Sequence, residues 1–490
     1  MAGWETLFQK IDDYRWLIPR SFMKEMKGDG LLYAAEPMLP LIYEEKAHVQ
    51  VANVACLPGL VGKSLAMPDI HLGYGFAIGG VAAFDPDAGG VISPGGVGYD
   101  INCGVRVLRT DLHKDEVRKK INDIVNELAR EVPSGVGSTG ALSLSEKELD
   151  KVLSQGAKWA VKNGYGTQDD ILHTEENGSL PGADPSAVSS HAKERGKDQV
   201  GTLGSGNHFL EIQYVEEIYD EKAANTFGLY KDQVTIMVHT GSRGLGHQVC
   251  SDYINILHGA VSKYKIYLPD RQLVCAPVNS PEGRQYFSAM CAAANFAWCN
   301  RQLIMHWTRE SFAKAMGSSP AKLGISLIYD VCHNVAKMEM HGGQGPGAGD
   351  QVKKLCVHRK GATRAFPAGH PEIPKDYAGV GQPVLVPGDM GRYSYIMVGT
   401  ELAMKETWGS VCHGAGRSMS RSAALRKYSY QQLIDDLDKQ GIVARSASKK
   451  GLVEEAPGAY KDVREVVDVV HNSGLARKVA RLRPLAVVKG

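Results

Sequence analysis

Two glycine-rich stretches decide the fold: FAIGGVAAFD (76–85) and GGVISPGGVGYDINCGVRVL (89–108). Both alternate short apolar or β-branched runs with glycine pairs, which is typical of short strands joined by tight turns. The same character extends from Val49 to Arg109, so we expect strands throughout that segment. Glycine makes up 55 of the 490 residues, against roughly 7% in average proteins. It clusters beside His, Asp, Asn and Cys, which indicates places where the backbone approaches a ligand closely.

The remainder of the chain alternates predicted helices and strands. Residues 113–131 carry apolar side chains at helical spacing and predict an amphipathic helix. Ser280 before Pro281 is a helix start, with Ser as the N-cap, and this helix should run to about Met316. The opening, 5–35, is predicted as a short helical segment. Strands are predicted at 233–239, 324–334, 382–387 and 394–399. The C-terminal end is predicted to return to helix around 429–440 and 460–471.

The domain organisation follows from what the chain lacks. Residues 132–200 are polar and rich in Gly and Ser with helical pieces, so we interpret them as a helical or loop insertion. Elsewhere there is no internal repeat and no linker long enough to divide the chain. We therefore expect residues 1–490 to form one large α+β domain.

Composition limits the environment of the protein. Hydrophobic residues make up 43% and charged residues 22%, as in ordinary globular proteins, and no run of about 18 apolar residues predicts a membrane span. The first residues include Glu5, Asp12, Asp13 and Arg15, unlike a signal peptide, and the nine cysteines show no CxxC pair. We expect a cytoplasmic protein with reduced thiols, some of which could bind metal. The net charge of only +2 means that any RNA site must be a local basic patch.

Six motifs carry residues suited to metal or phosphate chemistry at strand ends or glycine turns. They are MPDIHLGYG (67–75), GGVGYDINCG (95–104), GTLGSGNHFLE (201–211), VHTGSRGLGH (238–247), YDVCHNVAK (329–337) and CHGAGRSMSR (412–421). Taken singly, an Asp or Cys in a turn is usually structural, and so is a His at the end of a strand. Their joint occurrence at glycine-flanked strand ends favours a shared site.

Four of these motifs, the second to the fifth, together predict a metal centre. Asp100 and Cys103 lie three residues apart in one glycine-rich turn and can converge on a cation, which a thiolate can also bridge. His208, His239 and His333 each lie beside a predicted strand or a GSGN turn. Imidazole, thiolate and carboxylate suit a transition metal, with Zn and Mn both open and ligand softness favouring Zn.

The glycine turns also predict an anion site. GSGNH, TGSRG and PGDMGRYS (387–394) offer runs of backbone N–H groups for phosphates, although none matches a P-loop or a dinucleotide fingerprint. Arg195, Arg243 and Arg417 lie near such turns and could add bidentate donors, although a single Arg is usually only a solvated surface residue. His413, in HGAGR, has little bulk around it, so it could be a metal ligand, a general base or a nucleophile.

These strings, in this order, resemble the RtcB family of RNA ligases from about Ala47 to Gly490. The resemblance implies the RtcB-type fold, with mixed β-sheets and flanking helices around a deep central dinuclear metal site. It implies two Mn²⁺ ions in place of Zn, held by Asp100, Cys103, His208, His239 and His333 with Cys103 bridging. It also implies His413 as the nucleophile that GTP guanylylates.

The resemblance further implies a substrate site and a reaction. RNA 2′,3′-cyclic phosphate or 3′-phosphate ends would be joined to 5′-hydroxyl ends through an RNA-3′-pp-5′-G intermediate, in tRNA splicing, RNA repair or both, with an archease-type activator as a possible partner. The GMP pocket would comprise Asn207, Glu211, Asn334, Ser394, Ala415, Gly416 and Lys489, and the RNA contacts Asp69, Arg195, Arg243 and Arg417.

One residue departs from the family pattern, and two other interpretations stay open. Asp389 stands where some relatives carry a small hydroxyl residue, so its role near the nucleotide is undefined. A dinuclear metal phosphodiesterase or nuclease would use the same ligand cluster without GTP or His413. A non-catalytic RNA-binding scaffold with a structural metal fits the many glycine turns and anion-binding groups less well.

Overall fold

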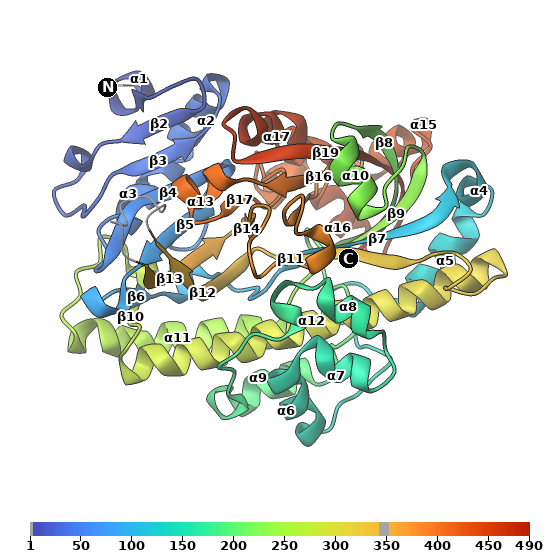
Figure 1. The fold of residues 1–490 in the computed structure, drawn as a ribbon, viewed down its shortest axis with the longest axis horizontal. Coiled ribbons are helices and arrows are strands. Elements are labelled where there is room, and N and C mark those ends of the chain that lie inside the picture. The colour runs from blue at the N-terminus through green and yellow to red at the C-terminus, as the bar shows by residue number, and fades with distance from the viewer. Residues whose placement is uncertain (1–2, 343–351) are drawn as a thin grey trace.

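Two large β-sheets form the centre of the computed structural model, which describes residues 3–342 and 352–490 (Figure 1). The seven-stranded sheet has the order β1-β2-β3-β4-β5-β13-β12. Its strands are β1 (Gln9–Lys10), β2 (Arg15–Ile18), β3 (Gly30–Tyr33), β4 (Leu60–His71), β5 (Ile78–Phe84), β13 (Lys353–Lys360) and β12 (Asn334–His341). No helix in the described ranges is long and apolar enough to cross a membrane.

The eight-stranded sheet has the order β11-β7-β9-β8-β19-β16-β15, with β18 paired to β19. Its strands are β11 (Ser326–Cys332), β7 (Gly104–His113), β9 (Gln233–Thr240), β8 (Phe209–Ile218), β19 (Ala476–Lys489), β16 (Ser394–Gly399), β15 (Pro383–Val386) and β18 (Val443–Ser446). Each large sheet is antiparallel apart from one parallel pair, β3–β4 in the first and β18–β19 in the second. The predicted α+β class with mixed sheets and flanking helices is therefore confirmed.

The chain passes directly from one sheet to the other at a single residue. Cys332 ends β11, Asn334 begins β12, and His333 lies between them. The register of the second sheet places Gly104 of β7 beside Cys332 and beside Thr240 of β9. The ends of several strands therefore meet near His333, and this meeting point is where the candidate site forms.

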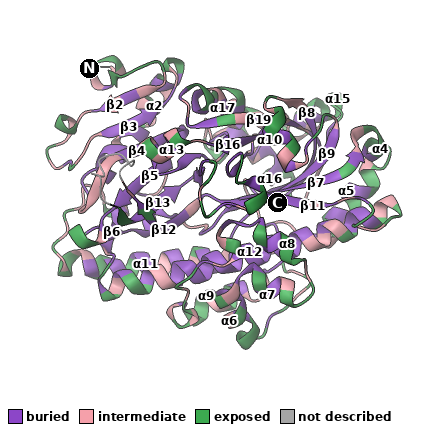
Figure 2. Ribbon diagram, in the orientation of Figure 1, coloured by how far each residue is buried: buried purple, intermediate pink, exposed green. Residues whose placement is uncertain are grey.

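One long helix supports the second sheet from below (Figure 1). It is α12 (Pro281–Met316), which lies beside α11 (Arg243–Lys263), and Ser280 caps it by accepting a hydrogen bond from the Gly283 N–H, as predicted. Its middle is buried on all sides (Figure 2). A helix that is buried all round needs partners on every face, and here those partners include the sheet, α11 and the helices of residues 132–200.

Residues 132–200 provide helices that pack onto α12. These are α6 (Glu146–Gln155), α7 (Ala157–Lys162), α8 (Gln168–Leu172) and α9 (Ser190–Gly196). Leu149, Val152, Trp159 and Ile171 are buried in one hydrophobic cluster with residues of α11 and α12. The polar, glycine-rich composition of this segment therefore conceals a substantial apolar face.

Several other predictions need correction. The opening 5–35 contains three strands, β1 to β3, after the four-residue α1 (Trp4–Leu7). Trp16 and Ile18 of β2 alternate into the core, and β2 pairs with a strand on each side. The segment from Val49 begins within a helix, α3 (Ala47–Val54). The helix at 113–131 is two helices, α4 (Lys114–Arg118) and α5 (Ile121–Glu131).

The C-terminal part follows the prediction only in its helices. The helices α15 (Tyr430–Lys439) and α17 (Val463–Asn472) occur where they were expected. The chain then continues into β19, a 14-residue strand that was not predicted. The strands expected at 233–239, 324–334, 382–387 and 394–399 correspond to β9, β11, β15 and β16.

Candidate metal centre and adjoining cavities

The five predicted ligand residues converge where the strand ends meet. Cys103 immediately precedes β7, His208 immediately precedes β8, and His239 is the penultimate residue of β9. The Cys103 Sγ lies 3.4 Å from His208 Nε2 and 3.3 Å from His239 Nε2. His208 Nε2 lies 2.9 Å from Asp100 Oδ2, and His239 Nε2 lies 3.3 Å from His333 Nε2.

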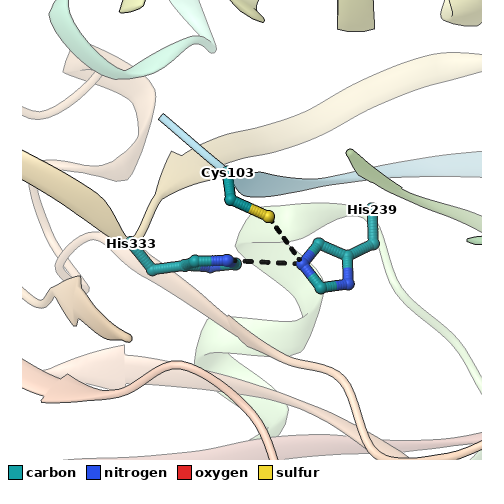
Figure 3. A group of neighbouring side chains, drawn as sticks. All are labelled: Cys103, His239 and His333. Carbon is teal, nitrogen blue, oxygen red and sulfur yellow. Dashed lines mark hydrogen bonds between the residues drawn. The ribbon is translucent and has the colours of Figure 1, made fainter. Parts of the chain in front are cut away.

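Cys103 belongs to both halves of this cluster. Its sulfur, with the ring nitrogens of His239 and His333, forms one group of close ligand atoms (Figure 3). The same sulfur forms a second group with Asp100 and His208, and within each group all ligand atoms lie within 4.8 Å of one another. Two overlapping groups that share a thiol have the arrangement required for two cations with one bridging ligand.

The hydrogen bonds of His208 are compatible with a bound cation. Its Nδ1 lies 2.9 Å from the carbonyl oxygen of Leu203, so Nδ1 carries a proton. Its Nε2 faces Asp100 Oδ2 at 2.9 Å, and this pair can be satisfied by a second ring proton or by a cation bound to both atoms. A carbonyl partner on the opposite nitrogen is typical of metal-bound histidine.

Burial affects the protonation of His239, His333 and Cys103. It lowers the pKa of His239 and of His333 well below the usual value, so both imidazoles are neutral and can donate a lone pair. His333 Nδ1 has no hydrogen-bond partner among the described residues. Burial raises the pKa of the Cys103 thiol well above its usual range, and Asp100 adds to this. The thiol is therefore protonated without a cation, and a bound metal ion would stabilise the thiolate.

A buried arginine fixes the backbone on both sides of the cluster. Arg301 of α12 donates from Nη1 to the carbonyl oxygens of Asn102 and Thr240, at 2.8 and 2.9 Å. These residues are the chain neighbours of Cys103 and His239. The ligand positions therefore depend on α12, although α12 contributes no ligand.

A cavity of about 360 Å³ opens beside the cluster and is lined by Asp100, Cys103, His239 and His333. His413 lines the same cavity, and its ring lies 4.9 Å from that of His333, centroid to centroid. Asp69 Oδ2 accepts hydrogen bonds from the His413 backbone N–H, at 3.0 Å, and from ring Nδ1. The proton on Nδ1 leaves the lone pair on His413 Nε2.

The pairing of His413 with Asp69 depends on a close approach between the loop after His413 and the end of β4. Gly416 follows His413 by three residues and has a φ of +71°, which favours glycine. A side chain there would collide with the carbonyl oxygen of Asp69. The HGAGR sequence thus lets the loop lie directly on the end of β4, which carries Asp69.

The cavity brings together six of the seven residues predicted for the nucleotide. Its lining includes Asn207, Glu211, Asn334, Ala415, Gly416 and Lys489. Ser394 is buried behind the wall, where its hydroxyl accepts from Gln213 Nε2 at 3.1 Å and from the Gly388 N–H at 3.2 Å. Gln213 also donates to Glu211 Oε2 at 2.7 Å, and Gly388 lines the cavity, so Ser394 contacts the cavity wall through Gln213 and through Gly388.

Glu211 and Lys489 are two buried ionisable groups in this wall. Burial raises the pKa of the Glu211 carboxyl to about 8, against the opposing effects of Gln213 and Lys489. Burial also lowers the pKa of Lys489, against the attraction of Glu455 and Glu211. The Glu211 carboxyl can therefore change protonation near neutral pH when a ligand enters.

The structure defines the surroundings of Asp389, whose role the sequence left open. Its side chain is buried at the cavity wall, where Oδ2 accepts from Arg392 Nε at 2.5 Å and Oδ1 accepts from the Gly391 N–H at 3.1 Å. Burial nevertheless raises its pKa. The carboxylate is thus neutralised by Arg392 and does not face the cavity as a bare charge.

A second cavity, of about 710 Å³, adjoins the first and shares Asp100, Asn207 and Arg421 with it. Arg195 and Arg243 line it, as predicted for an RNA site. The other two predicted RNA residues lie elsewhere: Arg417 lines the first cavity and pairs with Glu455 Oε2 at 3.0 Å, and Asp69 is fully buried under His413.

Sequence reasoning missed several residues of the site. Arg421 lines both cavities and pairs with Glu455 Oε1 at 3.0 Å. It ends the CHGAGRSMSR motif, so a signal for it existed. Glu455 had none, because nothing in its neighbourhood predicts that it joins two arginines. His71 lines the first cavity and lies in the MPDIHLGYG motif, but only Asp69 of that motif was given a role.

Taken together, the arrangement combines a buried cluster of metal-ligand residue types, His413 in the adjoining cavity and a second cavity lined by Arg195 and Arg243. Such a combination suits transfer of a phosphoryl or nucleotidyl group to a histidine, followed by reaction with a polyanion in the neighbouring cavity.

Comparison with known proteins gives a consistent result over the whole chain. The model of the RtcB family, described as tRNA-splicing ligase RtcB, matches residues 50–490. A tRNA-splicing ligase RtcB of Archaeoglobus fulgidus is 55% identical over 486 residues, which are 99% of this chain and 99% of that protein. The protein of the same name from Thermococcus kodakarensis is 55% identical over 482 residues, 98% of each chain. That of Methanococcus maripaludis is 53% identical over 481 residues, 98% of this chain and 99% of the relative.

Proposed function

The chain belongs to the RtcB family and is an RNA ligase, and from this premise we propose that it seals RNA with GTP and two Mn²⁺ ions through a guanylylated His413. The RNA ends would be a 2′,3′-cyclic phosphate or 3′-phosphate and a 5′-hydroxyl. The observation that carries the proposal is the position of His413. Its ring faces the cavity beside the ligand cluster but belongs to neither ligand group, and Asp69 holds its Nδ1.

The first step would take place at His413 Nε2. Asp69 accepts the Nδ1 proton, so the Nε2 lone pair would attack the α-phosphorus of GTP. A bond would form between Nε2 and phosphorus, and the bond from that phosphorus to the bridging oxygen would break, releasing pyrophosphate. The backbone N–H of Gly416 would hold the phosphate that stays on the histidine, since that of Ala415 donates to the Pro387 carbonyl oxygen at 3.0 Å.

The residues of the cluster fit two metal ions by their chemistry. Asp100, Cys103 and His208 would hold one ion, and Cys103, His239 and His333 the other. When bound, Mn²⁺ would neutralise negative charge on the phosphoryl oxygens. The choice of Mn²⁺ over Zn²⁺ rests on the family resemblance, since the donor set fits either.

The guanine base would be selected by Glu211. An ionised carboxylate accepts hydrogen bonds from the N–H groups of guanine, and adenine lacks that pair of donors. Gln213 and Ser394 would keep the carboxylate in position. The preference for GTP over ATP would then follow from one buried side chain.

The later steps, transfer of GMP to the RNA and sealing of the two ends, would use both cavities. A 2′,3′-cyclic phosphate would first be opened by water, which breaks the bond from phosphorus to O2′ and leaves a 3′-phosphate and a 2′-hydroxyl. An oxygen of the RNA 3′-phosphate would then attack the phosphorus of the His413 adduct, giving RNA-3′-pp-5′-G and freeing the imidazole. The 5′-hydroxyl of the second RNA would then attack the 3′-phosphate and release GMP. Arg195 and Arg243, in the second cavity, would hold the backbone of that RNA.

The biological setting is also part of the proposal. The names of the relatives support a role in tRNA splicing, and the same chemistry would serve RNA repair. Nine unpaired cysteines, all buried, fit the reducing cytoplasm. An archease-type activator is proposed from the family resemblance alone.

The decisive experiment tests His413. Wild-type protein incubated with labelled GTP and Mn²⁺ should gain one GMP mass as an acid-labile, alkali-stable adduct, as expected of a nitrogen–phosphorus bond. His413→Ala should lose the adduct and GTP-dependent ligation while binding metal normally. Supplied with RNA that already carries a 3′-guanylylated end, the same variant should seal it, because that substrate bypasses the histidine.

Two outcomes would contradict the mechanism. One is GTP-dependent ligation by His413→Ala, and the other is a GMP adduct mapped to a lysine. Metal-dependent RNA cleavage without any adduct would instead support the phosphodiesterase alternative.

A further inference from the structure

His71 is a residue of the active-site cavity to which the mechanism above gives no task. It ends β4, two residues after Asp69, in the motif PDIH. Asp69 is buried under His413, whereas His71 is half-buried and lines the cavity.

The hydrogen bonding of the His71 ring determines what it can offer. Its Nδ1 lies 2.9 Å from the carbonyl oxygen of Asp69, and a carbonyl only accepts. Nδ1 therefore carries a proton. Burial lowers the pKa of this imidazole to about 3, so the ring is neutral and has no second proton. Nε2 is then an acceptor, and no side chain or backbone group of the described residues donates to it.

The possible partners of such an acceptor are few. Phosphate oxygens are themselves acceptors and would be repelled by the Nε2 lone pair. Neither metal-ligand group among the described residues includes His71. The N–H groups of guanine have a partner in Glu211 under the proposed function. The donors that every nucleotide bound here carries, whatever its base, are then the hydroxyl groups of ribose.

We propose that His71 Nε2 accepts a hydrogen bond from a ribose hydroxyl of the nucleotide bound in the cavity and so selects ribonucleotides over deoxyribonucleotides. This inference rests on the proposed function, because it takes the cavity as the site of GTP and the RNA 3′ end. The hydroxyl belongs either to the guanosine or to the terminal RNA nucleotide. In either case the donor is the same chemical group.

Discrimination should follow from the acceptor left without a partner. A site built to bind a hydroxyl rejects the analogue that lacks it, since its buried polar group then stays unpaired. The expected preference is roughly 5- to 100-fold in kcat/KM. The preference should apply to one hydroxyl only, because His71 has a single free lone pair.

The test compares matched substrates in matched variants. Adduct formation is measured with GTP, 2′-deoxy-GTP and 3′-deoxy-GTP, and transfer to RNA is measured with 3′-phosphate ends that carry or lack the terminal 2′-hydroxyl. His71→Asn keeps a donor for the Asp69 carbonyl but has no group at the Nε2 position. His71→Gln places an amide near that position and should restore part of the preference.

The expected result is a ratio that changes for one substrate pair. Wild type should disfavour one deoxy analogue, His71→Asn should bring that ratio close to one, and the other ratios should stay constant. The affected pair identifies the hydroxyl. Ratios within one variant cancel any general loss of folded enzyme, and His48→Asn, in the aromatic cluster of Phe8, Phe22 and Tyr43, is a matched control that should keep the wild-type ratios.

The outcomes distinguish a failure of the His71 assignment from a failure of the proposed ligase mechanism. If wild type forms the adduct but His71→Asn leaves every ratio unchanged, or slows all substrates equally, the assignment of His71 is overturned and the ligase mechanism stands. If wild type forms no adduct with GTP, the proposed mechanism fails and the assignment fails with it.

Discussion

Cys103 is the residue on which the metal centre depends most. Its sulfur is the one ligand atom common to both groups of the cluster, and burial keeps the free thiol protonated. A single side chain therefore links the two proposed ions. Removing it should affect both sites together, whereas removing an outer ligand should mainly affect one.

Cys103→Ala should accordingly abolish binding of both metals, and Cys103→Ser should retain only weak binding, because a hydroxyl does not ionise at neutral pH. Metal content after dialysis against Mn²⁺, measured by atomic emission, checks this. Cys250→Ala is the matched control, since Cys250 is buried in the hydrophobic cluster of α11 and α12. Normal Mn²⁺ stoichiometry in Cys103→Ala would rule out the bridging thiolate.

Glu211 should give the proposed nucleotide site a pH dependence. Its pKa of about 8, raised by burial, means that the empty site holds a protonated acid at neutral pH. Guanine needs the ionised form, so binding must release that proton. GTP affinity should rise by up to roughly tenfold per pH unit from about pH 6 to 8 and then level off.

Isothermal titration of GTP into the His413→Ala protein, which cannot form the adduct, measures this dependence directly. Glu211→Gln should bind GTP weakly, with little change over the same pH range and a reduced preference over ATP. An affinity for GTP that stays constant between about pH 6 and 8 would contradict the assigned role.

At the scale of elements, α12 holds the strand ends in place through a buried ionic network. Asp330 of β11 accepts from Arg106 Nε and Arg301 Nε, both at 2.8 Å, and from Trp298 Nε1 at 3.0 Å. Burial acts to raise the pKa of Asp330, but the two guanidinium groups outweigh it and lower the pKa. The stabilisation is therefore present above the ordinary pKa of Asp and lost as the pH falls through the lowered value.

Asp330→Asn should cost about 3–5 kcal/mol, because it leaves two guanidinium groups buried without a carboxylate. Urea unfolding at neutral pH measures the loss. Glu310→Gln, on an exposed position of α12, should stay within about 0.5 kcal/mol of wild type. A similar free energy of unfolding for both variants would show that the network is not needed for stability.

At the scale of the whole molecule, two adjoining cavities divide the chemistry. The first contains His413 and the metal cluster, and the second contains Arg195 and Arg243. Arg421 lines both, so a polyanion could extend from one to the other. As the proposed RNA site, this local concentration of positive charge would explain how a chain with a net charge of only +2 binds RNA.

RNA binding should weaken with salt, and Arg195→Ala and Arg243→Ala should each reduce the slope of log K against log salt by roughly one. Arg417→Ala should change the slope less, because Glu455 already neutralises Arg417. Arg130→Ala, on α5 and paired with Glu127 and Glu131, should leave the slope unchanged. Fluorescence anisotropy with a labelled 5′-hydroxyl RNA measures all four slopes. Wild-type slopes in both the Arg195 and Arg243 variants would exclude this groove.

The sequence alone determined the features that have a local physical cause. Ser280 and Pro281 start α12 through capping and a fixed backbone angle, which need no partner. The apolar, β-branched run 233–239 predicts β9, because such a run favours a buried strand. The ordered motifs also identified the family and the five side chains that converge, since the chemistry of a ligand is a property of its residue type.

Only the tertiary structure decided the features that depend on a distant partner. Trp16 and Ile18 become strand residues because β3 lies beside them, and β19 forms between β8 and β16 despite its many Arg and Lys residues. Likewise, Asp69 is buried under His413, and Ser394 lies behind the cavity wall. Hydrogen-bond pairing and burial join segments far apart in the chain, and no local pattern encodes which segments will meet.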